Sequence, residues 1–311
     1  MSQLKLETAQ REKLKIPILL SGASGAGKTL SALMLAYGIV ESMFPEADKE
    51  TQWSKIGVID TEHRRSLLYV DASPADQYIG KFQFVNLDKP FTVDRYEEAF
   101  YLLKNAGCEV IIIDSISHNW EGAGGMLDTV DSLGGRFNDW NKVKPLGDRF
   151  RELLINDEVH VISTARTKQD YIMELNEKGK MAPRKVGLKT VQKDELEYEF
   201  AVSFRIEQGA VAYVMKDNSN IFSEPRLLTV EDGRKLYAWS ETGIDVAKME
   251  RERREKEERQ RLSMIHWITS NQADPRINGI VMQAVSMMNL QLENWDYTSV
   301  LNLYKEIKGV E

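Results

Sequence analysis

The chain has 311 residues, 42% of them hydrophobic and 29% charged, which excludes wholesale disorder and a collagen-like or coiled-coil body. The formal net charge of −7 excludes a uniformly basic nucleic-acid coat, so any contact with DNA or RNA has to be local. No apolar run reaches the roughly 18 to 20 residues that span a bilayer, the N-terminus has no apolar signal core, and Cys108 is the single cysteine. These features predict a cytoplasmic protein without membrane contacts or intramolecular disulfides.

Short apolar runs alternate with helical segments along the first half of the chain. A predicted strand over residues 16–20 leads through a glycine-rich stretch into a predicted helix over residues 30–43. Further apolar runs follow at residues 56–59, 110–113 and 159–162. Because strands that alternate with helices form parallel sheets, the pattern predicts an α/β fold with a mostly parallel sheet covered on both faces.

The second half of the chain begins with antiparallel signals. Residues 199–207 and 210–215 read as two strands around a turn at Gln208 and Gly209, and residues 227–239 are interpreted as one more hairpin. The sequence thus predicts that the sheet ends in antiparallel strands.

Composition changes abruptly at residues 248–261, where almost every side chain is charged. Such a run indicates a solvated helix with ion pairs four residues apart, rather than a nucleic-acid contact. The tail after it regains apolar residues at helical spacing and predicts two or three helices joined by a turn at residues 271–275. We expect a core over residues 1–243, a charged helix or linker over 244–262 and a small C-terminal helical module over 263–311.

The strongest motif is GASGAGKT at residues 22–29, which matches G-x-x-x-x-G-K-[ST] between a predicted strand and a predicted helix. Glycines let backbone N–H groups converge on a phosphate, the helix start adds its positive end, and the lysine supplies a cation for the β- and γ-phosphates. The motif predicts a site for the phosphates of a nucleotide. The expected nucleotide contacts are Gly22, Ser24, Gly25, Ala26, Gly27, Lys28, Thr29, Leu30 and Asp114.

Two oxygen-bearing side chains are candidate magnesium ligands. Thr29 would bind Mg²⁺ through its hydroxyl, and Asp114, at the end of a neighbouring predicted strand, would hold the hydration shell of the ion. The alternative for Asp114 is an aspartate that merely starts a turn. ATP hydrolysis also needs a group that activates water, and Glu62 follows another strand end at Asp60. In the alternative interpretation, Asp60 and Glu62 simply cap the next helix.

Four segments together resemble the RecA-like P-loop ATPases, and within them the phage RecA-like single-strand annealing proteins of the Sak group. They are GASGAGKT, VIDTEHRRSLLYVD at residues 58–71, VIIIDSISHNW at 110–120 and HVISTARTK at 160–168. The resemblance covers roughly residues 14–225, and the I-D-x-E-H element points to RecA rather than to GTPases, kinases or ABC ATPases. It implies a RecA-like core in which the bound nucleotide is ATP and Glu62 activates water.

The resemblance leaves two roles open. RecA has a γ-phosphate-sensing glutamine after the strand matching residues 159–164, but here the candidates are Thr164, Arg166 and Gln169. RecA-like rings and filaments place a basic residue from the neighbouring subunit against the γ-phosphate, and Lys216 is the candidate here, the alternative being a surface lysine. The resemblance therefore implies a homo-oligomer.

RecA-like proteins also have two DNA-binding loops, which would lie at about residues 117–138 and 166–193 of this chain. The second segment has eight basic and three acidic side chains, a local excess suited to a phosphate backbone, the alternative being a merely solvated hairpin. Trp120, Phe137, Trp140 and Tyr171 are candidates for stacking on bases or, alternatively, core or interface residues. The expected DNA contacts are Arg166, Lys168, Lys178, Lys180, Arg184, Lys185 and Lys189.

The first functional hypothesis is an ATPase, stimulated by single-stranded DNA, that promotes annealing or strand exchange. The absence of a long N-terminal domain favours the minimal phage type, acting in the cytoplasm of a bacterial host, with a single-strand-binding protein as a further candidate partner. One alternative is a hexameric helicase or helicase-loading motor. The other is a nucleotide-dependent switch whose C-terminal helices hold a partner protein.

Overall fold

The computed structural model describes residues 6, 8–175, 181–193 and 196–309. The chain folds into two compact units. One comprises residues 14–242, and the other comprises residues 243–311 together with the N-terminal segment that ends at Lys13. Within the described ranges, every helix is too short or too polar to span a lipid bilayer.

The larger unit is built on a mostly parallel sheet whose strand order is β3-β2-β4-β5-β1-β7-β8-β9, with β6 paired to β5. Parallel pairing joins β3 through β7 in this order, whereas β6, β8 and β9 are antiparallel to their neighbours. This arrangement confirms the predicted sheet, including its antiparallel end. The strands are β1 (Pro17–Gly22), β2 (Ile56–Asp60), β3 (Gln83–Asn86), β4 (Val110–Asp114), β5 (His160–Leu175), β6 (Met181–Thr190), β7 (Val202–Ile206), β8 (Val211–Asp217) and β9 (Arg226–Leu227).

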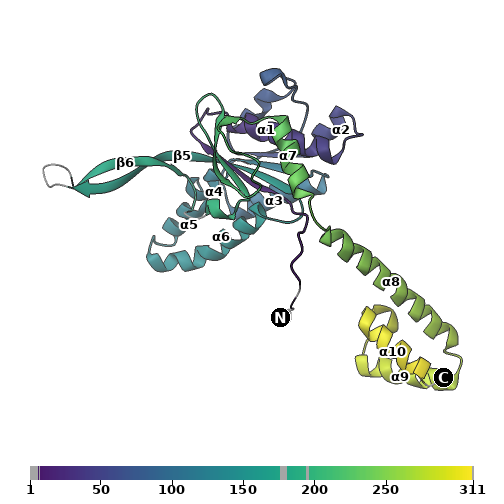
Figure 1. The fold of residues 1–311 in the computed structure, drawn as a ribbon. Helices are drawn as coiled ribbons and strands as arrows, with labels where there is room; N and C mark the ends of the chain where they lie inside the picture. The colour runs from purple at the N-terminus through teal and green to yellow at the C-terminus, as the bar shows by residue number, and fades with distance from the viewer. Residues whose placement is uncertain (1–5, 7, 176–180, 194–195, 310–311) are drawn as a thin grey trace. The chain divides into compact units, whose positions relative to one another are not determined.

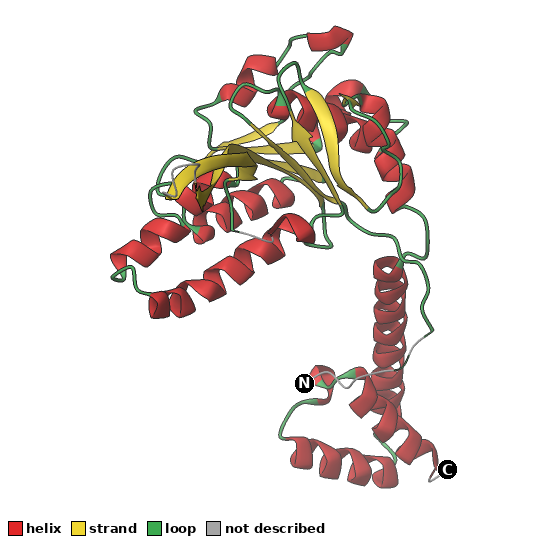
Figure 2. Ribbon diagram, turned by 60° about the vertical axis from the view of Figure 1, so that its left-hand side comes forward, coloured by secondary structure: helices red, strands yellow, loops and turns green. Residues whose placement is uncertain are grey.

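Helices cover both faces of the sheet, as Figure 2 shows. Buried β-branched residues of the strands contribute to the cores on both sides. In β4, Val110 and Ile112 face one hydrophobic core, while Ile111 and Ile113 face the other. The first core is covered by α1 (Lys28–Met43), α2 (Lys49–Ser54) and α7 (Val230–Ser240). The second is covered by α3 (Val93–Asn105), α4 (Ser117–Glu121), α5 (Met126–Ser132) and α6 (Trp140–Leu154).

The hairpin expected over residues 227–239 is wrong, because β9 is followed directly by helix α7. Thr229 and Asp232 form a capping box at the start of this helix. The Asp232 carboxylate accepts hydrogen bonds of 2.9 Å from both the backbone N–H and the hydroxyl of Thr229. These bonds satisfy N-terminal donors of the helix, and the Thr-x-x-Asp spacing was a signal that favoured a helix over a strand.

Both segments expected as DNA-binding loops are more regular than predicted. Residues 117–138 contain α4 and α5, and residues 166–193 contain the continuation of β5 and its antiparallel partner β6. We call the paired strands from Thr167 opposite Thr190 to Leu175 opposite Met181 the hairpin arm. Figure 1 shows the arm projecting from the sheet. Cross-strand pairing satisfies the backbone N–H and C=O groups that an irregular loop would leave to water.

Glycines bring α1 and α7 into close contact. A Cβ atom added to Gly38 of α1 would lie 2.0 Å from the carbonyl oxygen of Val230, and one added to Gly233 would lie 2.3 Å from that of Leu35. Backbone atoms cannot move away as a flexible side chain can. Since the helix that begins at Lys28 is packed in this way, the contact fixes its position on the sheet.

Gly38→Ala is therefore expected to lower the free energy of unfolding by about 1–3 kcal/mol, the usual cost of overpacking a core. Gly147→Ala is the matched control, because Gly147 also lies within a helix but a Cβ there would meet no atom within 4 Å. The control should raise stability by about 0.5–1 kcal/mol through helix propensity. Chemical denaturation of both variants measures the difference, and equal stabilities would contradict close packing of the two helices.

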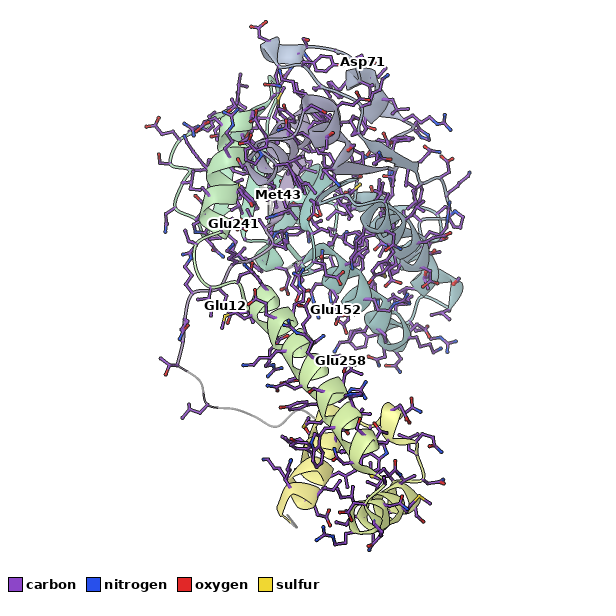
Figure 3. The ribbon with its side chains drawn as sticks, turned by 90° about the vertical axis from the view of Figure 1, so that its right-hand side faces the viewer. Glu12, Met43, Asp71, Glu152, Glu241 and Glu258 are labelled. Carbon is purple, nitrogen blue, oxygen red and sulfur yellow. The ribbon has the colours of Figure 1, made fainter. Side chains whose placement is uncertain are left out.

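The smaller unit contains α8 (Val246–Asn271), α9 (Pro275–Met288) and α10 (Tyr297–Gly309) around a core of its own. The charged part of α8 carries the predicted ion pairs four residues apart, such as Lys248 with Glu252 and Arg253 with Glu257. Figure 3 shows the side chains along this helix, with Glu258 labelled. The expected boundaries, between core and linker at residue 243 and between linker and C-terminal module at residues 262 and 263, stay predictions. Helix α8 continues across residues 262 and 263 without interruption.

Candidate functional site

The glycine-rich motif forms the turn between β1 and α1. Gly25 and Gly27 have φ angles of +78° and +104°, in the left-handed region that favours glycine. A Cβ on Gly27 would also lie 2.7 Å from the Cβ of Ala210. Gly22 ends β1, and Gly27 directly precedes Lys28, the first residue of α1. The N–H groups of the first helical turn therefore lie beside the loop, where they could bind an anion.

The remaining motif side chains differ in exposure. Ser24 is exposed, Ala26 is buried, and Leu30 is half-buried in the first turn of α1. Lys28 is buried, and its Nζ donates hydrogen bonds of 2.9 Å to the carbonyl oxygen of Gly22 and 2.8 Å to that of Ala23. Burial lowers the pKa of Lys28, although nearby Asp114 and Glu62 oppose this shift. The ammonium group is thus held over the loop.

Asp114 lies between two threonine hydroxyls. Its carboxylate accepts hydrogen bonds of 2.5 Å from Thr29 and 2.5 Å from Thr164. Burial raises the pKa of Asp114, although both hydrogen bonds favour the ionised form. The expectation that Asp114 ends a strand adjacent to β1 is wrong, because β5 lies between β1 and β4. Thr29 spans this gap because it projects from the start of α1.

The pair of Thr29 and Asp114 fits a magnesium ion. A hydroxyl and a carboxylate are hard oxygen ligands, and Mg²⁺ usually keeps several waters and binds phosphate oxygens beside one or two protein ligands. Among the described residues, no group of three or more His, Cys, Asp and Glu side chains could hold a metal. The donor set therefore suits Mg²⁺ that arrives with a nucleotide better than a metal caged by protein alone.

The sheet register brings the ends of several strands to one edge. Asp60 pairs with Asp114, and Asp114 pairs with Thr164 on β5. Two residues further along β5, Arg166 pairs with Gly22 at the end of β1. Since parallel strands end at the same edge, residues far apart in the sequence meet beside the phosphate-binding turn.

Asp60 and Glu62 have different surroundings. The Asp60 carboxylate accepts bonds from the backbone N–H of Glu62 at 2.7 Å and of Ser66 at 3.0 Å, so it caps the turn that follows β2. The Glu62 side chain does not cap this turn. Its carboxylate contacts Ser115 and Arg166 instead. The capping interpretation thus applies to Asp60 alone.

Both carboxylate oxygens of Glu62 are bound by Arg166. Nε of Arg166 lies 2.8 Å from Oε1 and Nη2 lies 2.5 Å from Oε2, while the Ser115 hydroxyl donates to Oε1 at 3.2 Å. Burial raises the pKa of Glu62, but the hydrogen bonds and positive charge of Arg166 more than offset it, so the net pKa is lowered. The pKa of His118 is itself lowered by burial, and a positive charge on His118 would lower the pKa of Glu62 further. Glu62 is therefore ionised at neutral pH.

Residues of the glycine-rich motif, together with Glu62, Asp114 and Arg166, surround a cavity of about 160 Å³. Arg65, Leu68 and Tyr69, which no sequence pattern singled out, also line it. Arg65 reaches Ser24 of the motif at 3.4 Å. All three lie in the short helix η1 (Arg65–Tyr69), within the same VIDTEHRRSLLYVD segment that identified Glu62. The lining residues are Ser24, Gly25, Gly27, Lys28, Thr29, Glu62, Arg65, Leu68, Tyr69, Asp114 and Arg166.

Three further candidates, Thr164, Gln169 and Lys216, do not line this cavity. Gln169 lies further along β5 in the hairpin arm, opposite Leu188. Lys216 lies on β8 and pairs with Ser203 of β7. Three residues after Ser203, β7 reaches Ile206, which pairs with Gly22 of β1. Its Nζ donates a 2.5 Å hydrogen bond to the carbonyl oxygen of Tyr198. A role for Lys216 in the site of a neighbouring subunit stays a prediction.

A second cavity, of about 500 Å³, lies at the base of the hairpin arm. The rings of Trp120 and Trp140 lie 5.8 Å apart with a tilt of 32°, and Lys168 lies 3.9 Å from Glu121. Phe137 is exposed outside this lining. We call this cavity the tryptophan–lysine groove; it is lined by Trp120, Trp140, Lys168, Lys189, Thr190, Val191, Gln192 and Lys193.

The other expected DNA contacts give less structural information. Lys178 and Lys180 lie outside the described residues, and the side chains of Tyr171, Arg184 and Lys185 are likewise not described. Arg166 faces the Glu62 cavity rather than the groove. Of the seven expected DNA contacts, the structure thus places Lys168 and Lys189 at the groove.

A family model described as "AAA domain" matches residues 14–238 of the chain. No curated protein matches it. Similar solved structures include a KaiC-like protein from Pyrococcus horikoshii OT3 with 17% identity and a TM-score of 0.39, covering 68% of this chain and 84% of that one. The RadB recombinase has 14% identity, coverages of 66% and 83%, and a TM-score of 0.36. The flagellar accessory protein FlaH from Methanocaldococcus jannaschii has 15% identity, coverages of 70% and 89%, and a TM-score of 0.36.

Proposed function

The chain belongs to the AAA domain family, and on this premise we propose that it hydrolyses ATP, binds single-stranded DNA and promotes annealing or strand exchange. Its larger unit is a RecA-like P-loop core, a mostly parallel sheet flanked by helices. The observation that carries the proposal is the position of the two cavities. Arg166 lines the cavity at the glycine-rich motif, and Lys168, two residues further along β5, lines the tryptophan–lysine groove.

The first cavity supplies the groups that ATP hydrolysis needs. Backbone N–H groups of the motif and the Lys28 ammonium would bind the phosphates, while Thr29 and Asp114 would hold Mg²⁺. When bound, the ion would neutralise charge on the β- and γ-phosphates. Glu62 would accept a proton from the attacking water, which requires the carboxylate to be ionised, as it is here.

The groove has the chemistry of a single-strand site. Aromatic rings stack on unpaired bases without sequence preference, and lysines bind the phosphate backbone. Trp140 is 36% exposed, so part of its ring is accessible. The basic residues of the hairpin arm would extend the contact. The Sak-like phage origin, the bacterial cytoplasm, a homo-oligomer that uses Lys216 in trans and a single-strand-binding protein as partner belong to the same proposal.

The decisive experiment measures ATP turnover with and without single-stranded DNA. It also measures DNA binding in the presence of a non-hydrolysable ATP analogue. DNA-stimulated turnover and ATP-dependent binding, followed by annealing of complementary strands, are the expected results. Unwinding of a forked duplex with defined polarity would favour the helicase alternative. ATP turnover that is indifferent to DNA, with no DNA binding, would contradict the proposal and favour the nucleotide-dependent switch.

Lys168→Ala/Lys193→Ala is expected to weaken binding of single-stranded DNA and to flatten its salt dependence. Each lost phosphate contact lowers the slope of log affinity against log salt by about 0.7, so the two together lower it by about 1.4. The matched control is Lys49→Ala/Lys81→Ala, which removes two exposed lysines elsewhere in the same unit. A salt slope unchanged from the wild type would place the DNA site outside the groove.

A further inference from the structure

Arg166 belongs to both functional regions, since its side chain binds Glu62 and its backbone begins the hairpin arm. We propose that Arg166 is a positioning residue that keeps Glu62 inactive until DNA in the tryptophan–lysine groove displaces the adjoining part of β5. This inference rests on the proposed function and adds a mechanism of regulation to it. Bound DNA would thereby control the rate of ATP hydrolysis.

The contacts of Glu62 define the inactive position. Arg166 engages both carboxylate oxygens, and Ser115 adds a third donor. A carboxylate whose lone pairs already accept charged hydrogen bonds is a weaker acceptor for the proton of water. Glu62 therefore has the right location for a general base, but its oxygens are occupied until the guanidinium moves.

The backbone of Arg166 connects this ion pair to the groove. Its N–H donates to the Ser117 hydroxyl at 2.9 Å, and its carbonyl oxygen accepts from the N–H of Val191 at 2.7 Å. Val191 and Lys168 both line the groove. A phosphate that binds Lys168 would therefore pull on β5 two residues from the ion pair, and a base beside Trp120 would press against the segment that contains Val191.

The ion pair is placed so that it can exchange partners. The Arg166 side chain is 35% exposed, and it lines the same cavity as Lys28 and Asp114. Because the Arg166 side chain is partly exposed, a guanidinium released from Glu62 would be solvated by water rather than left buried without a partner. The charged and titratable groups that face Glu62 are Lys28 from α1, Asp114 from β4, His118 from α4 and Arg166 from β5.

Arg166→Gln should raise the DNA-free kcat about tenfold, equivalent to a barrier about 1.4 kcal/mol lower, with KM for ATP changed less than about threefold. The ratio of DNA-stimulated to DNA-free turnover should fall towards one. Arg166→Lys keeps the charge but not the planar fork, so its DNA-free rate should lie between those of the wild type and Arg166→Gln. Arg205→Gln is the matched control, because Arg205 forms a 3.0 Å ion pair with Glu207 and is 33% exposed, and its rate should equal that of the wild type.

Two results would overturn the inference. The first is a DNA-free rate of both Arg166 variants that is equal to or below that of the wild type. The second is a rate gain from Arg166→Gln that persists in a Glu62→Gln background, because Arg166 would then not act through Glu62. Failure of the proposed function gives a different pattern, in which the wild type itself neither binds DNA nor responds to it.

Discussion

Glu62→Gln is expected to lower ATP turnover by about 10²–10⁴-fold, the usual contribution of a general acid or base. Glutamine has nearly the same shape but cannot accept a proton from water. The phosphate-binding turn, Lys28 and Asp114 remain, so nucleotide affinity should change by less than about threefold. Steady-state kinetics and titration with a fluorescent ATP analogue measure the two quantities on the same preparation.

The matched control for Glu62→Gln is Glu98→Gln, which makes the same change at an exposed position of α3. It should leave both turnover and affinity at the wild-type values. If Glu62→Gln turned over ATP at the wild-type rate, Glu62 would not be the group that activates water. A parallel loss of turnover and nucleotide affinity would mean that the substitution disturbs the phosphate-binding turn rather than the activation of water.

Lys28→Ala is expected to lower kcat/KM for ATP by at least about 10²–10³-fold, the effect of removing one donor that stabilises a developing negative charge. The buried ammonium is held over the phosphate-binding turn by the carbonyl oxygens of Gly22 and Ala23. Unlike Glu62→Gln, this substitution should weaken nucleotide binding as well as turnover. The difference arises because Lys28 would contact the phosphates in the ground state.

Lys235→Ala, at an exposed position of α7, is the control for Lys28→Ala and should behave as the wild type. Loss of folding is a separate explanation that near-UV circular dichroism distinguishes from loss of a phosphate contact. A folded Lys28→Ala protein with wild-type kcat/KM would contradict the assignment of this turn as the nucleotide site.

The phosphate-binding turn was predictable because its determinants are local. Glycines at positive φ, a lysine at the helix start and an apolar strand before it all lie within about a dozen residues. The same is true of β4 and Asp114, where an uninterrupted β-branched run ends in a carboxylate. Such patterns fix the local backbone and the burial of each strand, and these suffice to predict the fold class.

Features that depend on pairing between distant segments were not predictable. No local pattern shows that β5 lies between β1 and β4, or that Arg166 contacts Glu62 across 104 positions of the sequence. The resemblance to RecA placed a DNA-binding loop at the arm, with a solvated hairpin as the alternative, and the structure shows that cross-strand pairing makes it a hairpin. Trp120 and Trp140 were recognised as aromatic candidates, but their ring contact depends on the fold of α4 and α6.

The hairpin arm also sets a rule for how its length can change. Beyond the irregularity between Asp170 and Tyr171, its strands pair without a break from Tyr171 opposite Lys185 to Leu175 opposite Met181. Since side chains alternate faces with a period of two, deleting two residues from each strand keeps all others on their original faces, while deleting one exchanges the faces. Each such step shortens the arm by about 7 Å. If the arm binds nucleic acid as proposed, its reach would change only in such discrete steps, while the sheet edge that carries the glycine-rich turn stays unchanged.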